Sequence, residues 1–126
     1  MMNKAELDKM YENVKIKENL IIARVARKTI RYIEKNIINF PKEYNVLRDN
    51  IIASCYDILK CIYRANILQE INDKKEIIIN ICMLNFYLEE AYLKKIISKR
   101  KFEIYVNHLI GLDKMTRSWL KYEKSE

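Results

Sequence analysis

The chain has 126 residues, 50% of them hydrophobic and 33% charged, with one proline, one glycine and a net charge of +7. The hydrophobic content excludes a disordered chain, and the scarcity of turn residues argues against β-sandwiches, β-barrels and glycine-rich phosphate loops. We therefore expect a single all-α domain over residues 1–126, in which residues 1–15 form a frayed or flexible N-terminal extension.

The first predicted helix, over about residues 16–38, is apolar on one face and basic on the other. Its aliphatic side chains recur at steps of three and four residues, as they do along one face of a helix. Its cations repeat in the same way on the opposite face. They are Arg24, Lys28, Arg31 and Lys35, with Arg27 beside them. Because Glu34 is the one acidic residue among these cations, ion pairs within the helix can neutralise little of the charge.

Pro41 is predicted to separate the first two helices. A residue before proline is pushed out of the α region, and proline suits the first turn of a helix, where its missing N–H costs nothing. We therefore expect a hairpin corner at Asn39-Phe40 and a second helix over about residues 42–69. The inward face of this helix comprises Leu47, Ile51, Cys55, Ile58, Ile62 and Ala65.

The third predicted helix extends from about residue 73 to 97 and is apolar on two opposite faces. Asp73 and Glu76 have the spacing of a capping box at its start. One apolar face can enter the core of a bundle, whereas the other needs a further partner. This second face consists of Ile79, Cys82, Phe86, Leu93 and Ile97. We expect it to be an oligomer interface; the alternatives are a second binding partner and a loosely packed terminal segment.

A fourth predicted helix, over about residues 99–121, follows Ser98 as its N-cap and turns Phe102, Val106, Leu109 and Leu120 inward. Short turns between such helices predict an up-down-up-down four-helix bundle, in which the first and last helices are neighbours. Residues 1–40 carry nine Lys and Arg against five Asp and Glu, a balance of +4, and residues 98–126 carry seven against four, a balance of +3. The whole charge excess therefore lies on the two helices that should be adjacent.

This charge distribution predicts one basic surface that binds the phosphates of RNA or DNA. The expected residues are Arg24, Arg27, Lys28, Arg31 and Lys35 from the first helix and Lys114, Arg117 and Lys121 from the last. Binding should be largely independent of base sequence, because no recognition-helix, zinc-finger or RNA-binding aromatic signature is visible. A solvated helix face that binds nothing is the alternative interpretation of the basic stripe.

No set of residues suits catalysis, a metal ion or a cofactor, so we expect a protein that is not an enzyme. His108 lacks a carboxylate or cysteine at ligand spacing, and Cys55 and Cys61 point about 120° apart on a helix. The three cysteines have no CxxC spacing, which is typical of reduced thiols in the cytoplasm. No signal peptide or membrane span is predicted, so the expected location is cytoplasmic.

Three segments carry a resemblance to a known family. They are "FPKEYNVLRDNIIASCYDILKCIYRAN" from the first corner onward, "LNFYLEEAYLKKIISKRKFE", and the closing "LDKMTRSWLK" with Lys114, Met115, Trp119 and Lys121. In this order they resemble the accessory variability determinant family of bacterial diversity-generating retroelements. The chain departs from that family at Arg117-Ser118, where glycines are frequent, and at Glu89 and Glu90, where an arginine is common.

The resemblance implies a basic four-helix bundle that assembles as a homopentamer. It also implies that the protein assists the element's reverse transcriptase in template-primed cDNA synthesis, as a non-catalytic subunit that binds nucleic acid. One alternative is the related bundle family encoded by intervening sequences of 23S rRNA genes. The other is a structural adaptor that binds a protein partner without nucleic acid.

Overall fold

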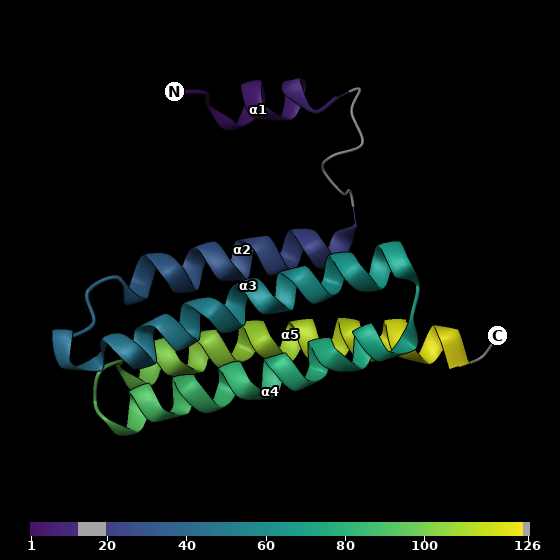
Figure 1. Ribbon diagram of the computed structural model, residues 1–126. Coiled ribbons are helices and arrows are strands. Elements are labelled where there is room, and N and C mark those ends of the chain that lie inside the picture. Colours follow the sequence, from purple (N-terminus) through teal and green to yellow (C-terminus); the bar gives the residue numbers. More distant parts are fainter. Residues whose placement is uncertain (13–19, 125–126) are drawn as a thin grey trace.

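The computed structural model describes residues 1–12 and 20–124, and within these ranges the chain is all-α, as predicted. Its elements are α1 (Lys4–Met10), α2 (Ile21–Ile37), the 3-10 turn η1 (Lys42–Tyr44), α3 (Asn45–Leu68), α4 (Ile71–Leu93) and α5 (Lys99–Lys124). The four long helices, α2 to α5, run alternately in opposite directions and form a helical bundle (Figure 1). Each packs against the next, and α5 packs against α2. The short α1 lies apart from them in Figure 1.

The corner between α2 and α3 is longer than the proline predicts. Pro41 has an extended backbone, with ψ of 143°, and precedes the 3-10 turn, which the Tyr44 N–H closes by donating to the Pro41 carbonyl at 2.9 Å. The α-helix starts only at Asn45, so the prediction that Pro41 opens the second helix was wrong by about one turn. Phe40 is buried and fastens this corner to the core. The predicted start of the first helix near residue 16 lies outside the described residues.

The corner between α3 and α4 corrects the predicted capping box. α4 begins at Ile71, so Asp73 lies inside its first turn and is not the N-cap. The chain reverses at Gln69, which has a left-handed φ of 56° and whose N–H donates the last helical hydrogen bond to the Ala65 carbonyl at 3.0 Å. Such a position favours glycine, and the glutamine there gave no signal in the sequence. Asp73 instead forms an ion pair across the corner with Arg64, at 3.4 Å.

The turn between α4 and α5 removes Ile97 from the predicted interface. α4 ends at Leu93 rather than near residue 97, because Lys95 adopts a left-handed φ of 61°. The N–H of Ile96 then donates to the Ala91 carbonyl at 2.9 Å, which is the pairing of a Schellman helix end. Ile97 consequently turns into the core and is 7% exposed. Ser98 caps α5 as predicted, accepting from the Lys101 N–H at 3.1 Å.

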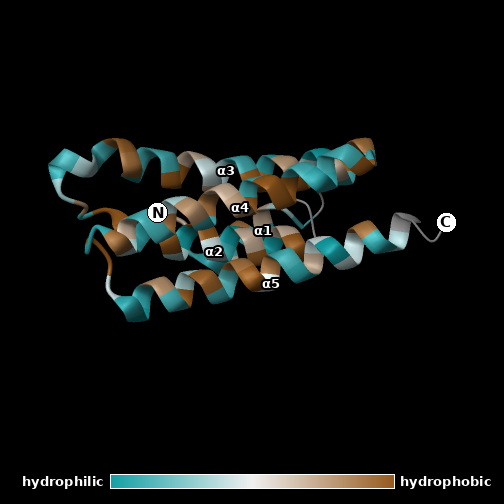
Figure 2. Cartoon of the chain, turned by 90° about the horizontal axis from the view of Figure 1, so that it is seen from below, coloured by the Kyte–Doolittle hydropathy of each residue, from teal (hydrophilic) through white to brown (hydrophobic). Residues whose placement is uncertain are grey.

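The core lies between the four long helices, and the apolar faces of α2, α3 and α4 enter it as their periods predict. Of the inward face predicted for the fourth helix, only Leu109 is buried; Phe102 is partly buried, and Val106 and Leu120 are outside the core cluster. In Figure 2, hydrophobic and hydrophilic segments alternate along each long helix, as expected of amphipathic helices. The largest fully buried apolar side chains include Ile33, Ile51, Ile62, Leu84 and Leu112. Tyr105 is also fully buried, although the inward face predicted for the fourth helix omitted it. None of the helices in the described ranges is long and apolar enough to cross a membrane.

A buried lysine joins the beginning of α4 to the end of α5. Lys74 is 1% exposed, and its Nζ lies 4.3 Å from the centre of the Trp119 ring. The same Nζ donates to the Trp119 carbonyl at 3.5 Å. A cation over an indole face is stabilised by the ring quadrupole, more strongly so when water is excluded. Trp119 therefore closes one end of the core, which is a structural role.

Replacing Gly111 by Ala is expected to stabilise the protein. Gly111 lies within α5, its φ is not positive, and a Cβ built there meets nothing within 4 Å. Alanine in a helix interior is favoured over glycine by about 1 kcal/mol. For a chain of this size we expect a melting temperature about 4 °C higher, measured by circular dichroism. A lower melting temperature would show that the site is crowded in solution.

Candidate nucleic-acid interface

The outer face of α2 carries four cations in a row. Arg24, Lys28, Arg31 and Lys35 are all exposed, on the side of the helix opposite its buried face. The alternating steps of four and three residues align them, so their charges follow the helix axis. Within the described residues none of the four is in an ion pair.

Glu34, the one acidic residue of α2, lies away from this row. Its carboxylate accepts a hydrogen bond from the Tyr56 hydroxyl of α3 at 2.8 Å. This hydrogen bond is the main reason why the pKa of Tyr56 is raised, because it favours the protonated phenol. Glu34 is therefore held at the seam between α2 and α3, and the row of cations keeps its charge.

Arg27 differs from the other predicted cations of α2. It is half-buried, and its guanidinium donates to the Tyr63 hydroxyl of α3 at 2.6 Å. The Arg27 side chain therefore lies between α2 and α3, as that of Glu34 does, and not on the outer face of α2. The sequence analysis assigns Arg27 and Lys28 to the same basic surface. In the packed bundle Arg27 is half-buried against α3, whereas Lys28 is exposed.

The predicted cations of α5 are exposed as well. Arg117 donates to the Asp113 carboxylate one turn earlier, at 2.8 Å, which offsets part of its charge. Lys114 and Lys121 are in no ion pair within the described part of the chain. Of the eight predicted contacts, Arg27 and Arg117 thus already have partners inside the molecule.

The packing of α2 against α5 makes neighbours of two helices that each carry exposed cations. The Tyr32 ring lies 5.8 Å from that of Tyr105 and 5.4 Å from that of His108. Arg24 is eight residues before Tyr32, and Lys114 is nine after Tyr105 and six after His108. Because the helices are antiparallel, Arg24 and Lys114 are at about the same height along the bundle. Both side chains are exposed. The predicted adjacency of the first and last long helices is confirmed.

A second group of cations, which the sequence analysis did not single out, surrounds the turn between α4 and α5. It consists of Lys94, Lys95, Lys99, Arg100 and Lys101, all exposed. Lys94 pairs with Glu90 at 2.7 Å and Lys99 with Glu103 at 3.9 Å, which leaves three of the five without an ion pair in the described ranges. The signal for this group in the sequence is the run "KKIISKRK", which bridges the end of one helix and the start of the next.

The second apolar face of α4 lies on the surface, except at Ile97. Ile79 is 52% exposed, Phe86 50% and Leu93 66%, and Cys82 is exposed too. Met83, which the sequence analysis left out, belongs to the same face at 41% exposure. We refer to Ile79, Cys82, Met83, Phe86 and Leu93 as the α4 face.

The described residues contain no group of three or more His, Cys, Asp or Glu side chains that could hold a metal ion. His108 packs its ring against Tyr32. The described part of the chain is a basic helical bundle in which α4 exposes an apolar face. No family model, curated protein or solved structure matches it. The resemblance to the accessory variability determinant family stays a prediction.

Proposed function

We propose that this chain binds nucleic acid non-specifically through the outer face of α2, as a protein without catalytic activity. One observation carries the proposal: four aligned cations are exposed, while Glu34, the acidic residue of the same helix, bonds to Tyr56 instead. Unpaired, ordered cations attract the phosphate backbone and release its condensed counterions. Contacts of this kind position a strand and carry no base sequence information.

The dimensions of the row suit a polyanion. Arg24 and Lys35 are eleven residues apart, which corresponds to about 16 Å along the helix. Phosphates follow one another along each duplex strand every 3.4 Å of axis, so the row covers several of them. Lys114 and Lys121 add exposed positive charge on the neighbouring helix α5.

The finer proposal is that the protein is an accessory subunit of a reverse transcriptase in a diversity-generating retroelement. It rests on the resemblance of the segments from Phe40 to Lys121, which implies an up-down-up-down bundle that assembles as a pentamer. The exposed α4 face supports self-association. In a ring the basic face would repeat in each subunit, which multiplies weak phosphate contacts through effective concentration.

A structural adaptor is the second candidate function, and the exposed α4 face favours it, because a protein partner could cover that face instead. The two functions differ in their response to salt. Nucleic-acid binding predicts that the logarithm of affinity falls linearly with the logarithm of salt concentration, by roughly 0.7 to 0.9 per phosphate contacted.

The deciding measurement is the fluorescence anisotropy of labelled single-stranded and duplex oligonucleotides between about 50 and 200 mM salt. Four contacts predict a slope of about −3 for single strands and −3.6 for duplexes. Similar affinities for unrelated sequences are expected. Absence of binding at the lowest salt would reject the nucleic-acid function in favour of the adaptor.

The reverse-transcriptase role has its own test. A reverse transcriptase encoded near this gene should co-purify with the protein more strongly when template RNA is present, because RNA can bridge two basic proteins that repel each other. cDNA synthesis should fall when the α2 cations are neutralised. A source genome without a neighbouring reverse transcriptase would shift the assignment to the ribosomal intervening-sequence family.

A further inference from the structure

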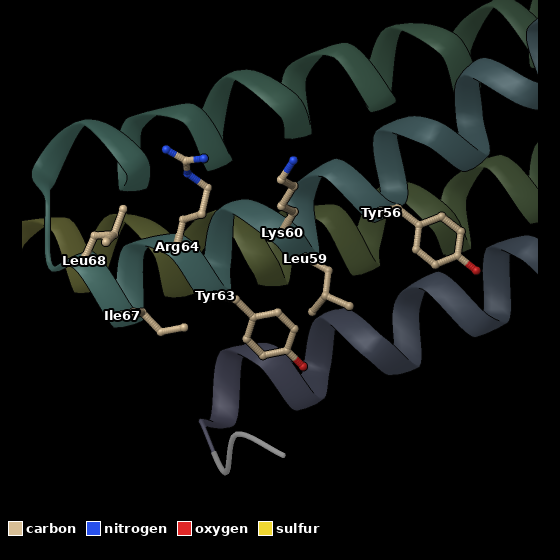
Figure 3. Close-up of a pocket in the computed structure, with 7 residues that line it drawn as sticks. All are labelled: Tyr56, Leu59, Lys60, Tyr63, Arg64, Ile67 and Leu68. Atoms are coloured by element: carbon tan, nitrogen blue, oxygen red, sulfur yellow. The ribbon is translucent and has the colours of Figure 1, made fainter. Parts of the chain in front are cut away.

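An open hollow of about 490 Å³ lies on the outer side of α3 (Figure 3). All of its lining side chains come from α3. Tyr56 and Tyr63 extend toward α2, whereas Lys60 and Arg64 extend toward α4 (Figure 3). The surface between these two borders is open to solvent. It takes no part in the nucleic-acid binding proposed for α2.

Several of the side chains that line the hollow are apolar and exposed to solvent. Ile67 is 71% exposed, Leu68 51% and Tyr56 49%. The side chains from Tyr56 to Ile67 repeat at helical spacing over about 16 Å, which is three turns. A contiguous patch of this kind on a soluble surface indicates a protein contact.

The tyrosine border is already held in position by α2. The Tyr56 hydroxyl donates to Glu34 at 2.8 Å, and the Tyr63 hydroxyl accepts from Arg27 at 2.6 Å. Both rings are therefore fixed at their far ends before any partner arrives. A preformed wall reduces the side-chain entropy that binding would otherwise cost.

The α4 face has matching dimensions. Its side chains repeat at helical spacing from Ile79 to Leu93, over about 21 Å, and present a convex apolar helix surface. An apolar helix face of three to four turns is long enough to cover the hollow, which extends over three turns of α3.

The charges at the edges of the two surfaces are opposite. Lys60 and Arg64 border the hollow, and no acidic residue lines it. Arg64 is paired with Asp73 at 3.4 Å, whereas Lys60 is in no ion pair within the described residues. Glu76 and Glu89 flank the α4 face, both exposed and neither in an ion pair within the described residues. Lys75 lies on the same side of α4, and Lys94 and Lys95 follow Leu93 at the end of this face. Glu76 and Glu89 are the carboxylates that can pair with a cation at the border of the hollow in a second copy.

We propose that the α4 face of one copy packs into the α3 hollow of the next copy. The proposal specifies the contact behind the self-association that the proposed function includes, and it involves no nucleic acid. Since the two surfaces differ, the interface is heterologous: every copy offers one hollow and one α4 face, and assembly continues head to tail until a ring closes.

Two single variants test this arrangement. Ile67→Glu places a charge in the hollow, and Phe86→Lys places a charge on the α4 face. Both positions are exposed, so each variant should fold like the wild type, which circular dichroism would verify. Each variant alone should be monomeric at concentrations at which the wild type assembles, with the midpoint of assembly raised at least about 100-fold. An equimolar mixture should form a one-to-one dimer, because each variant keeps the surface that the other lacks.

Light scattering on nucleic-acid-free protein gives the readout, and Val46→Glu is the matched control. Val46 is on α3 outside the hollow and is 74% exposed, so this variant should assemble like the wild type. A dimer formed by Ile67→Glu alone would show α4 packing on α4, and a mixture that stays monomeric would reject the pairing. A wild type that is monomeric at about 100 μM would also overturn it, whatever the result of the salt titration.

The same variants distinguish other occupants of the hollow. If Ile67→Glu assembles normally but binds oligonucleotides less tightly, the hollow contacts nucleic acid and the proposal is wrong. If it assembles normally and binds oligonucleotides normally, no second copy occupies the hollow. Either result leaves the proposed function of the α2 face untouched.

Discussion

Reversal of Arg24 and Arg31 to glutamate is expected to weaken nucleic-acid binding by at least about 100-fold at 0.1 M salt. Each phosphate contact releases about 0.9 counterion from a duplex, which is worth nearly tenfold in affinity at that salt concentration, and the variant loses two contacts. The slope of log affinity against log salt should become less steep by about 1.8. All base sequences should be affected alike, because the contacts are made to phosphates.

A matched double variant separates the α2 face from the overall charge. Lys42→Glu with Arg48→Glu lowers the net charge by the same four units, from +7 to +3, but acts on the 3-10 turn and the start of α3. If binding depends on the α2 face, this control loses far less affinity than the reversal of Arg24 and Arg31. Equal losses in the two double variants would show that net charge alone attracts the nucleic acid. Both proteins should retain wild-type helicity, since neither changes a core side chain.

Alkaline solution is expected to destabilise the protein strongly between pH 9 and 12. Burial, with a further contribution from the charge of Glu34, raises the pKa of the Cys55 thiol to about 12. Burial, with a contribution from Tyr32, raises the pKa of the Tyr105 phenol to about 12. Both groups are neutral when protonated, so the folded state opposes their ionisation and the unfolded chain does not.

The direction of the effect follows from this difference. The unfolded chain releases these protons near pH 9 to 10, whereas the folded protein retains them until about pH 12. Their contribution to stability is therefore complete below pH 9 and is lost as the pH rises toward 12. Each unit of pKa difference corresponds to about 1.4 kcal/mol, so the loss is several kcal/mol, a large part of a typical total of about 5–15 kcal/mol.

Urea unfolding at a series of pH values measures this loss, and single variants assign it. Cys55→Ala and Tyr105→Phe should each flatten the fall in unfolding free energy, while Cys82→Ala, at an exposed thiol, should leave it unchanged. Tyr105→Phe should also raise stability at neutral pH by about 1 kcal/mol, because the Tyr105 hydroxyl is buried without a hydrogen-bond partner in the described structure. A wild-type stability that stays constant up to pH 11 would contradict the prediction.

Helix periodicity in the sequence accounts for most of the fold and part of the candidate site. Apolar residues at steps of three and four define which face of a helix enters the core, and this is a local property of the chain. The exposed row from Arg24 to Lys35 and the exposed α4 face follow from the same rule. The N-cap at Ser98 was also predictable, because a side chain that caps a helix acts on the backbone three residues away.

The helix ends at Gln69 and Lys95 were not predictable in this way. Both residues adopt a left-handed backbone conformation, which glycine adopts most easily. The chain's one glycine lies inside α5 instead. What holds them there is the packing of the helices on either side, which over-determines the local conformation. This turn geometry moved Ile97 from the expected interface into the core and Asp73 from a cap to an ion pair.

The sequence by itself determined that the chain forms amphipathic helices, which residues face the core, and that the basic face of α2 contains almost no acid. These properties depend on residue types and spacing along one helix. Tertiary structure decided which cations keep a free charge and where the hollow lies. Glu34 and Arg27 bond to tyrosines of α3 that are 22 and 36 residues further along, and such partners depend on how two helices pack. A contact of this kind involves one side chain on each of two helices. It therefore produces no repeating pattern in the sequence from which it could be predicted.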